Sequence, residues 1–578
     1  MRRRALAGLL MCLAVATTGC VGIPEDGPIQ EVDSAVGPGE GLALYNDPPS
    51  PTPGAQPTDI VQGFLDAQTA IPLQTNAAEE FLTTEEAARW RPEGRTIIYA
   101  AASFPQGSNR VSVDLDGADQ IDARGSWLGP VSREDQELGF TMRRQDGEWR
   151  IDDAPDALVV PDTWFAQAYR RVSLYYLDPT ASILVPEPVF VPRGDQLGSS
   201  LVDALLRGPL NGLARTERSA IPPGLELDLS VSVTNDGIGE VNLIGSVSMP
   251  TEGDAALMVA QLARTLSQDS TFLGFTVTID GEPLTLPGGT TFAMDQGDAL
   301  DPAAPQATSL LFGVRDGLLV SGTPDDLTPE TGPLGTDQQG IRSVGVALTG
   351  SRVAAVTADG ARVLLTDVRS EDAALTEIVS GGNDLLPPVW DFADRLWLLD
   401  RTSAGARVSV HDDESGLREL RFPGITGEEI DRFLVSRDGS RMVAVLDRPR
   451  GDRILVSRIR YNSRGDAVGG SRTRQIAWDD QNRLRVLDLG WSSPTSVVIA
   501  HRLTGDLHQV RTMTVDGAPA GLPGLAATVQ RRPRSLVSSP RGTDAVYVTT
   551  RDGLLDVLSG SAAAGADPAL THLTYAGG

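Results

Sequence analysis

The spacing of apolar residues changes along the chain and divides it into three folded regions. Over 57–165 the period is helical at first, with Ile60 and Phe64 on one face and a second helical stretch over 76–90. The period then becomes two, in strand-like segments such as 111–115. Helices followed by a curved antiparallel sheet predict a small α+β domain over 57–165.

The next region, 168–295, mixes the two periods again. An apolar stretch at 172–177 is typical of a strand, and a turn at 235–237 lies between two alternating segments, as in a hairpin. Helical spacing is present around 197–205 and again around 257–266. We therefore expect a second α+β domain over 168–295.

The third region, 306–575, contains short strands separated by turns. A polar turn followed by an apolar strand recurs about every 45 to 55 residues, the spacing of four-stranded propeller blades. The five copies are 349–356, 393–399, 437–445, 494–500 and 541–548. We predict a β-propeller of about six blades, in which each copy is an inner strand and 309–322 supplies the closing blade. A pair of β-sandwiches is the alternative. The predicted fold class is thus α+β and all-β multidomain.

The N-terminus has the three parts of a secretory signal. Basic residues at 2–4 precede an apolar run at 5–16, which is shorter than the roughly 20 residues that span a bilayer. We predict a signal peptide over 1–19, cleaved at the Gly19–Cys20 bond. Because the chain after it has no other cysteine, we expect Cys20 to be lipidated as an N-palmitoyl, S-diacylglycerol cysteine. The lipid would anchor the protein to the extracytoplasmic face of the cell membrane. The alternative is an ordinary cleaved signal with an incidental cysteine.

The composition predicts a disordered segment between the lipid and the folded regions, and the net charge excludes some classes of binding partner. Residues 20–56 hold the lipidated cysteine and then prolines that alternate with Gly, Asp and Ser, which predicts a disordered tether. The formal net charge of the chain is -28. Such a chain repels nucleic acid and anionic headgroups, so we expect no nucleic-acid partner and a membrane attachment that depends on the lipid.

The residues contain no recognisable catalytic constellation. The four histidines, His411, His501, His508 and His572, stand in no metal-binding spacing. Cys20 would be acylated, and the sequence has neither a Gly-x-Ser-x-Gly elbow nor a phosphate-binding loop. We predict no enzymatic activity, no cofactor and no metal. An enzyme hidden in the third region is the least favoured hypothesis.

Arginines crowd one segment of the third region, although the chain is strongly acidic. Eight of them lie between residues 448 and 474. Arginine forms paired hydrogen bonds with carboxylates and is frequent in interface cores. We therefore take Arg453, Arg458 and Arg460 as candidate partner-binding residues, facing an acidic protein surface or a phosphate-bearing envelope polymer. The alternative is that these arginines form the solvated side of edge strands.

Several short segments resemble the actinobacterial lipoprotein LpqB family. Those similar to its sporulation and germination domain, GerMN, are 175–178 (YYLD), 184–187 (LVPE), 204–209 (ALLRGP), 219–222 (SAIP) and 265–266 (TL). The first region resembles the family's cystatin-like or nuclear-transport-factor-like N-terminal domain, and the third resembles its propeller in blade rhythm. The resemblance implies an accessory of the MtrB sensor kinase in the MtrA–MtrB two-component system. The accessory would bind the kinase ectodomain and affect cell envelope and division homeostasis. The resemblance implies no catalytic residues.

An envelope glycan- or lipid-binding module is the second hypothesis. Folds like the one expected for the first region often hold a cone-shaped pocket, and propellers bind ligands at their central channel. A deep pocket lined by Trp90, Trp127 or Trp149 would favour this hypothesis. A filled core would favour the kinase-binding adaptor.

Overall fold

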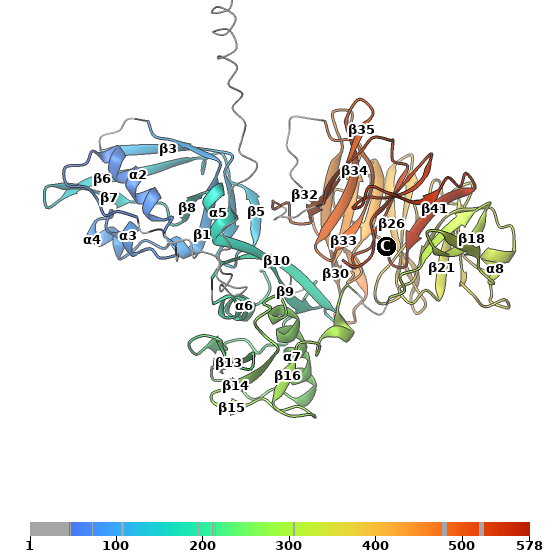
Figure 1. Cartoon of the computed structure of the whole chain (residues 1–578), viewed down its shortest axis with the longest axis horizontal. Helices are drawn as coiled ribbons and strands as arrows, with labels where there is room; N and C mark the ends of the chain where they lie inside the picture. Colours follow the sequence, from blue (N-terminus) through green and yellow to red (C-terminus); the bar gives the residue numbers. More distant parts are fainter. Residues whose placement is uncertain are drawn as a thin grey trace, which may run out of the picture. The chain divides into compact units, whose positions relative to one another are not determined.

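The chain folds into three successive sets of helices and sheets, coloured from blue to red in Figure 1. The computed structural model describes residues 46–578 except 47, 72, 106–108, 195, 211–212, 214, 304–306, 477–482 and 520–524. The predicted signal peptide, Cys20 and the tether up to residue 45 lie outside the described residues. In the part of the chain that is described, no helix combines the length and apolar character needed to cross a membrane.

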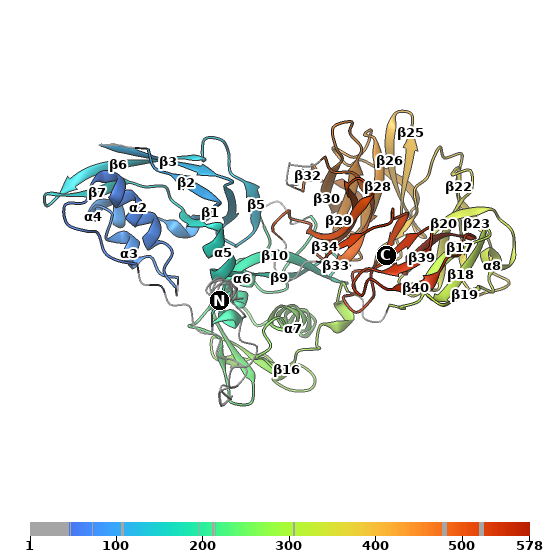
Figure 2. The same ribbon diagram turned by 45° about the horizontal axis from the view of Figure 1, so that its top comes forward.

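The first domain packs helices against two small sheets. Its strand orders are β2-β3-β6-β7 and β5-β4-β1-β8, and β1 and β8 run parallel. Helix α2 lies against the first of these sheets (Figure 2), and its Phe64 contacts Trp90 and Phe140 in the core. The elements are α2 (Pro57–Ala67), α3 (Asn76–Glu79), α4 (Thr84–Ala87), η1 (Pro92–Gly94), β1 (Arg95–Tyr99), β2 (Ala101–Ser103), β3 (Arg110–Asp116), β4 (Asp119–Asp122), β5 (Trp127–Pro130), β6 (Glu137–Gln145), β7 (Glu148–Asp153), β8 (Leu158–Pro161) and α5 (Asp162–Ala168).

Local capping explains why this domain lacks the single helix expected over 76–90. Thr83 precedes α4, and its Oγ1 accepts a hydrogen bond from the Glu86 backbone N–H at 3.2 Å. A new helix therefore begins at this point, and the stretch forms the two short helices α3 and α4. The helix predicted from Ile60 and Phe64 is confirmed, and both side chains are buried.

The middle domain has a long two-stranded ribbon and a mixed sheet. Strands β9 and β10 pair antiparallel along their whole length. Strands β13 and β14 pair parallel because α7 forms the crossover between them, beginning after the capping residue Thr251. The elements are β9 (Tyr169–Leu177), β10 (Leu184–Pro192), α6 (Leu197–Leu206), β11 (Glu226–Leu227), β12 (Ser232–Val233), β13 (Ile238–Ile244), α7 (Glu252–Leu266), β14 (Gly274–Ile279), β15 (Glu282–Pro283), β16 (Thr291–Ala293) and η2 (Asp298–Leu300). The predicted hairpin forms, since β11 and β12 both pair antiparallel with β13.

The third domain is a β-propeller. Between residues 311 and 575, the described strands form six blade-like sheets around the C-terminus (Figure 2). Its elements are β17 (Leu311–Arg315), β18 (Leu318–Thr323), β19 (Asp326–Pro329), α8 (Pro333–Thr336), β20 (Ile341–Val346), β21 (Arg352–Thr357), β22 (Arg362–Asp367), β23 (Thr376–Ser380), β24 (Val389–Trp390), β25 (Leu396–Thr402), β26 (Gly405–Asp412), β27 (Gly416–Leu420), β28 (Ile430–Val435), β29 (Arg441–Leu446), β30 (Arg453–Tyr461), β31 (Ala467–Gly470), β32 (Arg474–Gln475), β33 (Val486–Ser493), β34 (Ser496–Thr504), β35 (Leu507–Thr514), β36 (Ala526–Val529), β37 (Ser535–Val537), β38 (Tyr547–Thr550), β39 (Gly553–Asp556), β40 (Ala562–Gly565) and β41 (Leu570–Tyr575).

The ring closes by pairing strands from its two ends. The final strand β41 pairs antiparallel with β17, in a sheet of order β19-β18-β17-β41. The closing blade predicted over 309–322 is thus confirmed, and it is completed by the C-terminal strand. Because of this pairing, the innermost strand of the closing blade, β41, is hydrogen-bonded to its neighbour β17.

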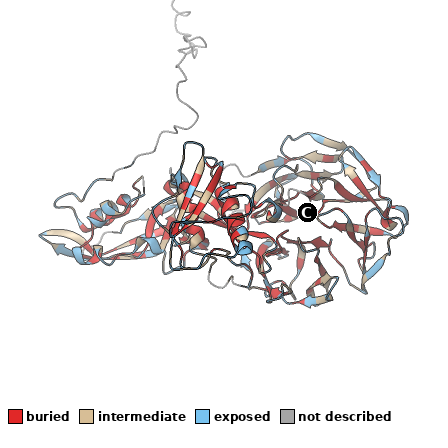
Figure 3. Ribbon diagram, turned by 90° about the horizontal axis from the view of Figure 1, so that it is seen from below, coloured by how far each residue is buried: buried red, intermediate tan, exposed pale blue. Residues whose placement is uncertain are grey.

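The repeated apolar strands occupy the second position of their blades. The five copies fall on β21, β25, β29, β34 and β38, each paired on both sides. Figure 3 shows buried residues along the blade strands, and β29 is buried at every position. A strand with covered faces and two paired edges is the most uniformly apolar, which is why the repeat marks it. Each copy is thus an inner strand of its blade, as predicted, and the innermost strands are the neighbours β20, β24, β28, β33 and β37.

Candidate functional site

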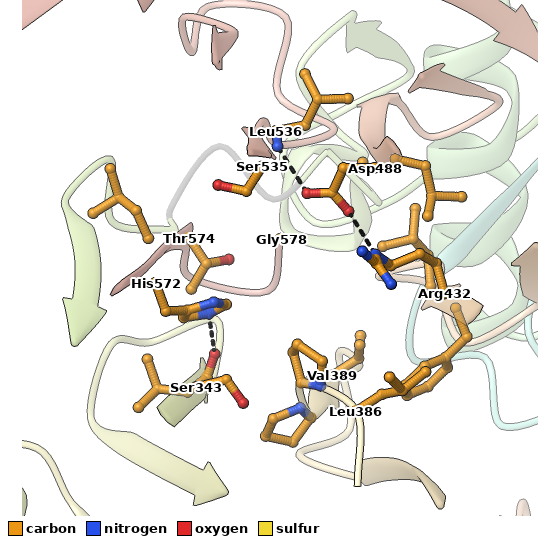
Figure 4. A pocket seen from close by; sticks show the side chains of 18 of the residues that line it. Ser343, Leu386, Val389, Arg432, Asp488, Ser535, Leu536, His572, Thr574 and Gly578 are labelled. Carbon is orange, nitrogen blue, oxygen red and sulfur yellow. Dashed lines mark hydrogen bonds and ion pairs between the residues drawn. The ribbon is translucent and has the colours of Figure 1, made fainter. Parts of the chain in front are cut away.

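The innermost blade strands surround a central channel. β20, β24, β28, β33, β37 and β41 each contribute residues to a cavity of about 350 Å³. Figure 4 shows His572 and Thr574 on one wall, with Arg432 and Asp488 on the other. The terminal residue Gly578 also lines this cavity. Polar side chains from different blades therefore converge in the channel.

A series of ion pairs runs from blade to blade around the channel. Asp384 accepts hydrogen bonds from Arg342 Nη2 at 2.6 Å and from Arg401 Nε at 2.9 Å. Burial alone would raise the pKa of Asp384, but these hydrogen bonds lower it below its ordinary value. The paired residues, in order around the ring, are Arg342, Asp384, Arg401, Asp431, Arg432 and Asp488. Each charged side chain of this series therefore has a partner of opposite charge within the series, and the ion pairs connect neighbouring blades.

The four histidines lie on four different strands of the propeller. His572 of β41 faces the channel with Nε2 2.9 Å from Val344 O, and burial lowers its pKa to about 4. Its imidazole is therefore neutral and donates from Nε2. His411, His501 and His508 lie on β26, β34 and β35. Among the described residues, no three His, Cys, Asp or Glu side chains gather in a way that could hold a metal ion.

A buried ion pair joins the middle domain to the propeller. Glu187 of β10 is 6% exposed and accepts hydrogen bonds from Arg441 Nη2 at 2.6 Å and Arg458 Nη2 at 2.5 Å. Arg441 and Arg458 lie opposite each other on β29 and β30, where two like charges repel. Burial alone would raise the pKa of Glu187, but the charges of both arginines lower it. An ionised carboxylate from the middle domain therefore stabilises a pair of propeller arginines.

A second carboxyl, that of Glu217, lies beside this ion pair. Glu217 is fully buried, and its carboxyl group shares a hydrogen bond with the carboxyl group of Glu187. Burial, followed by the negative charge of Glu187, raises its pKa well above the ordinary value. The cluster thus holds one ionised and one protonated carboxyl.

Sequence reasoning gave Glu187 and Arg441 no role. The available signal was a single charged residue inside an otherwise apolar strand, at 184–192 and again at 441–446. A charge in such a position needs a partner. The partner could not be identified locally, because Glu187 and Arg441 are 254 residues apart in the chain.

The three candidate partner-binding arginines, Arg453, Arg458 and Arg460, all lie on β30 but differ in their surroundings. Arg453 and Arg460 are exposed. Arg458 is ion-paired with Glu187, and only 22% of its side chain is exposed. This corrects the expectation for Arg458, because the buried carboxylate already occupies its guanidinium. Partner binding stays a prediction for Arg453 and Arg460.

The three tryptophans proposed to line a pocket in the first domain are packed against protein groups. Trp90 contacts Phe64 with ring centroids 5.2 Å apart, and Trp127 contacts Phe190 at 5.8 Å. Trp149 lies under an arginine guanidinium, 4.8 Å from its ring centroid. Trp90 and Trp127 belong to different apolar clusters, so these side chains do not converge on one pocket.

Three family models match successive parts of the chain. Residues 50–166 match the N-terminal domain of lipoprotein LpqB, and residues 317–566 match the β-propeller domain of lipoprotein LpqB. Residues 173–285 match the sporulation and spore germination model. These segments fall on the first domain, the propeller and the middle domain, respectively.

Relatives resemble the chain over nearly its whole length. Lipoprotein LpqB of Streptomyces avermitilis is 28% identical, covering 91% of this chain and 92% of the relative. Lipoprotein LpqB of Mycobacterium bovis is 26% identical, covering 97% and 98%. Among solved structures, the first GerMN domain of the Bacillus subtilis sporulation protein GerM is 20% identical, covers 21% of this chain and 92% of that chain, and has a TM-score of 0.18. Two models that bear the LpqB name flank the germination-type domain in the order found in the fold, and the chain belongs to the lipoprotein LpqB family.

Proposed function

We propose that this protein is a membrane-anchored lipoprotein on the extracytoplasmic face, which binds the ectodomain of an MtrB-type sensor kinase and modulates its signalling. The anchor is the lipid predicted on Cys20, in keeping with the name lipoprotein of the relatives. Two or more acyl chains hold a protein on a membrane for long times. Confinement to the membrane plane raises its effective concentration near a membrane-embedded kinase.

The observation that carries this proposal is the filled core of the first domain. Its tryptophans contact protein groups and do not line one ligand pocket. A hollow of about 420 Å³ lies where this domain meets β9, β10 and α6 of the middle domain, and none of these tryptophans lines it. We therefore assign recognition of a partner protein to the surface of the first domain. The buried Glu187 ion pair supports the proposal further, because it couples the middle domain to the propeller. An adaptor of this kind acts by binding two signalling states of the kinase with different affinity.

The proposal is tested by crosslinking in cells, followed by pull-down of the tagged full-length chain. Cys20→Ser removes the lipid attachment site, and Cys12→Ser is the matched control inside the predicted signal peptide. We expect the wild type and Cys12→Ser to recover the kinase ectodomain and Cys20→Ser to recover much less. Equal recovery of the kinase ectodomain by the wild type and both variants would contradict the role of the anchor.

The propeller channel favours one second candidate, an envelope glycan- or lipid-binding module. Its cavity of about 350 Å³ has polar walls formed by several blades. In the same pull-down, copurified glycan or lipid without any kinase would establish this candidate and remove the first. Neither proposal includes a catalytic step.

A further inference from the structure

A second hollow of the propeller is lined mainly by arginine. It has a volume of about 1180 Å³ and shares Arg432 and Arg534 with the central channel. Seven arginines and three aspartates line it, so its walls have an excess of positive charge. The whole chain, in contrast, has a formal net charge of -28. The hollow is therefore a local exception on an acidic protein.

Part of this positive charge is not used by the fold. Arg532, Arg534 and Arg551 are exposed, and their guanidinium groups have no hydrogen-bond or ion-pair partner within the described chain. Other arginines of the hollow are paired, as Arg485 is with Asp452 at 2.6 Å. Three guanidinium groups thus remain available to a ligand, and each presents a planar fork of donors suited to oxyanions.

A histidine in the wall of the hollow has one ring nitrogen without a hydrogen-bond partner among the described residues. His508 is 4% exposed, and its Nδ1 has no hydrogen-bond partner among the described residues. Burial lowers the pKa of His508, a hydrogen bond with the Asp506 backbone raises it, and the charges of Arg532 and Arg502 lower it; the net shift is downward. A buried polar atom without a partner is costly to the fold. A ligand group or its bound water at this wall would satisfy it.

We propose that this hollow binds a phosphate-bearing polymer of the cell envelope, with Arg532, Arg534 and Arg551 contacting successive phosphate groups. The envelope setting rests on the extracytoplasmic location proposed above, whereas the ligand chemistry rests on the hollow. Its volume exceeds what one phosphate needs, which favours a chain of them. Its lining includes no Phe, Tyr or Trp, the residues that anchor protein interfaces and stack on nucleic-acid bases. Fork-shaped donors with few apolar neighbours fit a phosphodiester chain better than a protein surface.

The test measures binding of the purified full-length chain to long-chain inorganic polyphosphate at physiological and at raised salt. The variant R532S/R534S/R551S removes the three available guanidinium groups. The matched control R110S/R133S/R407S removes the same charge at three exposed positions outside the hollow. A third variant, R532K/R534K/R551K, keeps the charge and removes the forks.

We expect the wild type and the matched control to bind alike, and the triple serine variant to bind about tenfold or more weakly, because several charge-assisted hydrogen bonds are lost. Binding by the wild type should weaken as salt rises. The lysine variant should fall between the two. Intact cooperative unfolding of each variant shows that the losses are local.

Three results would overturn the proposal. The first is no wild-type binding to polyphosphate at physiological salt, and the second is an equal loss in the matched control. The third is equal binding to poly-L-glutamate, which would assign the hollow to carboxylate chains.

Vesicles of anionic phospholipid form a separate arm of the test. Tighter binding to these vesicles than to polyphosphate would identify a lipid headgroup as the source of the phosphate. Kinase capture by the serine variant is scored separately, so a failure here is distinct from a failure of the adaptor.

Discussion

Glu187 and Glu217 lie in one buried cluster and are held in opposite protonation states. The charges of Arg441 and Arg458 keep Glu187 ionised, whereas burial and the charge of Glu187 keep a proton on Glu217. Removing one partner of a buried ion pair leaves an uncompensated charge, which costs far more than replacing a neutral acid. The two residues therefore offer a matched comparison.

We expect Glu187→Gln to lower the free energy of unfolding by about 3 to 5 kcal/mol. Glu217→Gln should change it by less than about 1 kcal/mol at neutral pH, because an amide resembles the protonated carboxyl. Urea unfolding followed by tryptophan fluorescence measures both variants. Equal destabilisation by the two substitutions would contradict the assigned protonation states.

The raised pKa of Glu217 also predicts a loss of stability as pH rises. Its pKa is higher in the folded than in the unfolded chain, where it is near 4.5, so the folded state holds the proton more tightly. Its contribution is fully present below the unfolded pKa and is lost as pH rises through the folded pKa. The free energy of unfolding, measured from the unfolded to the folded pKa of Glu217, should decline through this group in the wild type and not in Glu217→Gln. Parallel curves for the two proteins would refute it.

His572 makes the opposite prediction, on the acidic side. Burial lowers its pKa from 6.5 to about 4, so the unfolded chain binds the proton more readily. Its contribution is present above the unfolded pKa and is lost as pH falls towards the folded one. Between about pH 7.5 and about pH 5, the wild type should lose about 1 to 2 kcal/mol more stability than His572→Gln, whose amide can still donate to Val344 O. Urea unfolding at both pH values measures this difference, and an equal loss of stability in the two proteins would contradict the prediction.

At the level of elements, the sequence predicts the helices and strands whose pattern of buried and exposed positions is regular or recurs along the chain. The period of 3.6 identifies α2 and α7, and the apolar repeat identifies the second strand of five blades. The apolar repeat does not identify the innermost strands, because they face a polar channel and differ in length, from two residues in β24 to eight in β33. The break at Thr83 depends on one side-chain hydrogen bond, which helical spacing does not reveal.

The closing pair β17 and β41 can be tested by adding one methyl group. A Cβ at Gly313 would lie 2.6 Å from the His572 backbone oxygen on β41, so Gly313→Ala must force the two strands apart. We expect a loss of about 1 to 3 kcal/mol in stability, measured by thermal unfolding. Gly253→Ala is the matched control, because a Cβ there meets open space in α7 and should be neutral or stabilising. An unchanged Gly313→Ala protein would show that the closure tolerates separation.

At the scale of the whole molecule, local patterns predicted the order and type of the three domains, and family resemblance gave them names. The contacts between domains were beyond local pattern, because Glu187 and Arg458 are 271 residues apart in the chain. For this reason the sequence predicts a partner-binding role for Arg458, although the structure places it in an internal ion pair. Arg453 and Arg460 on the same strand remain exposed and stay candidates for the partner surface.

The most direct test of the adaptor is the affinity of the full-length lipidated chain, held in a lipid nanodisc, for the purified kinase ectodomain. We predict saturable binding by the wild type that weakens about tenfold in R453S/R460S, because arginine is enriched among the few interface residues whose truncation costs about 2 kcal/mol or more. The matched variant R362S/R407S, at exposed positions on two other propeller blades, should bind like the wild type. Absence of saturable binding by the wild type would contradict the central claim that this protein acts on a sensor kinase. Wild-type binding that R453S/R460S leaves unchanged would instead move the contact surface away from β30.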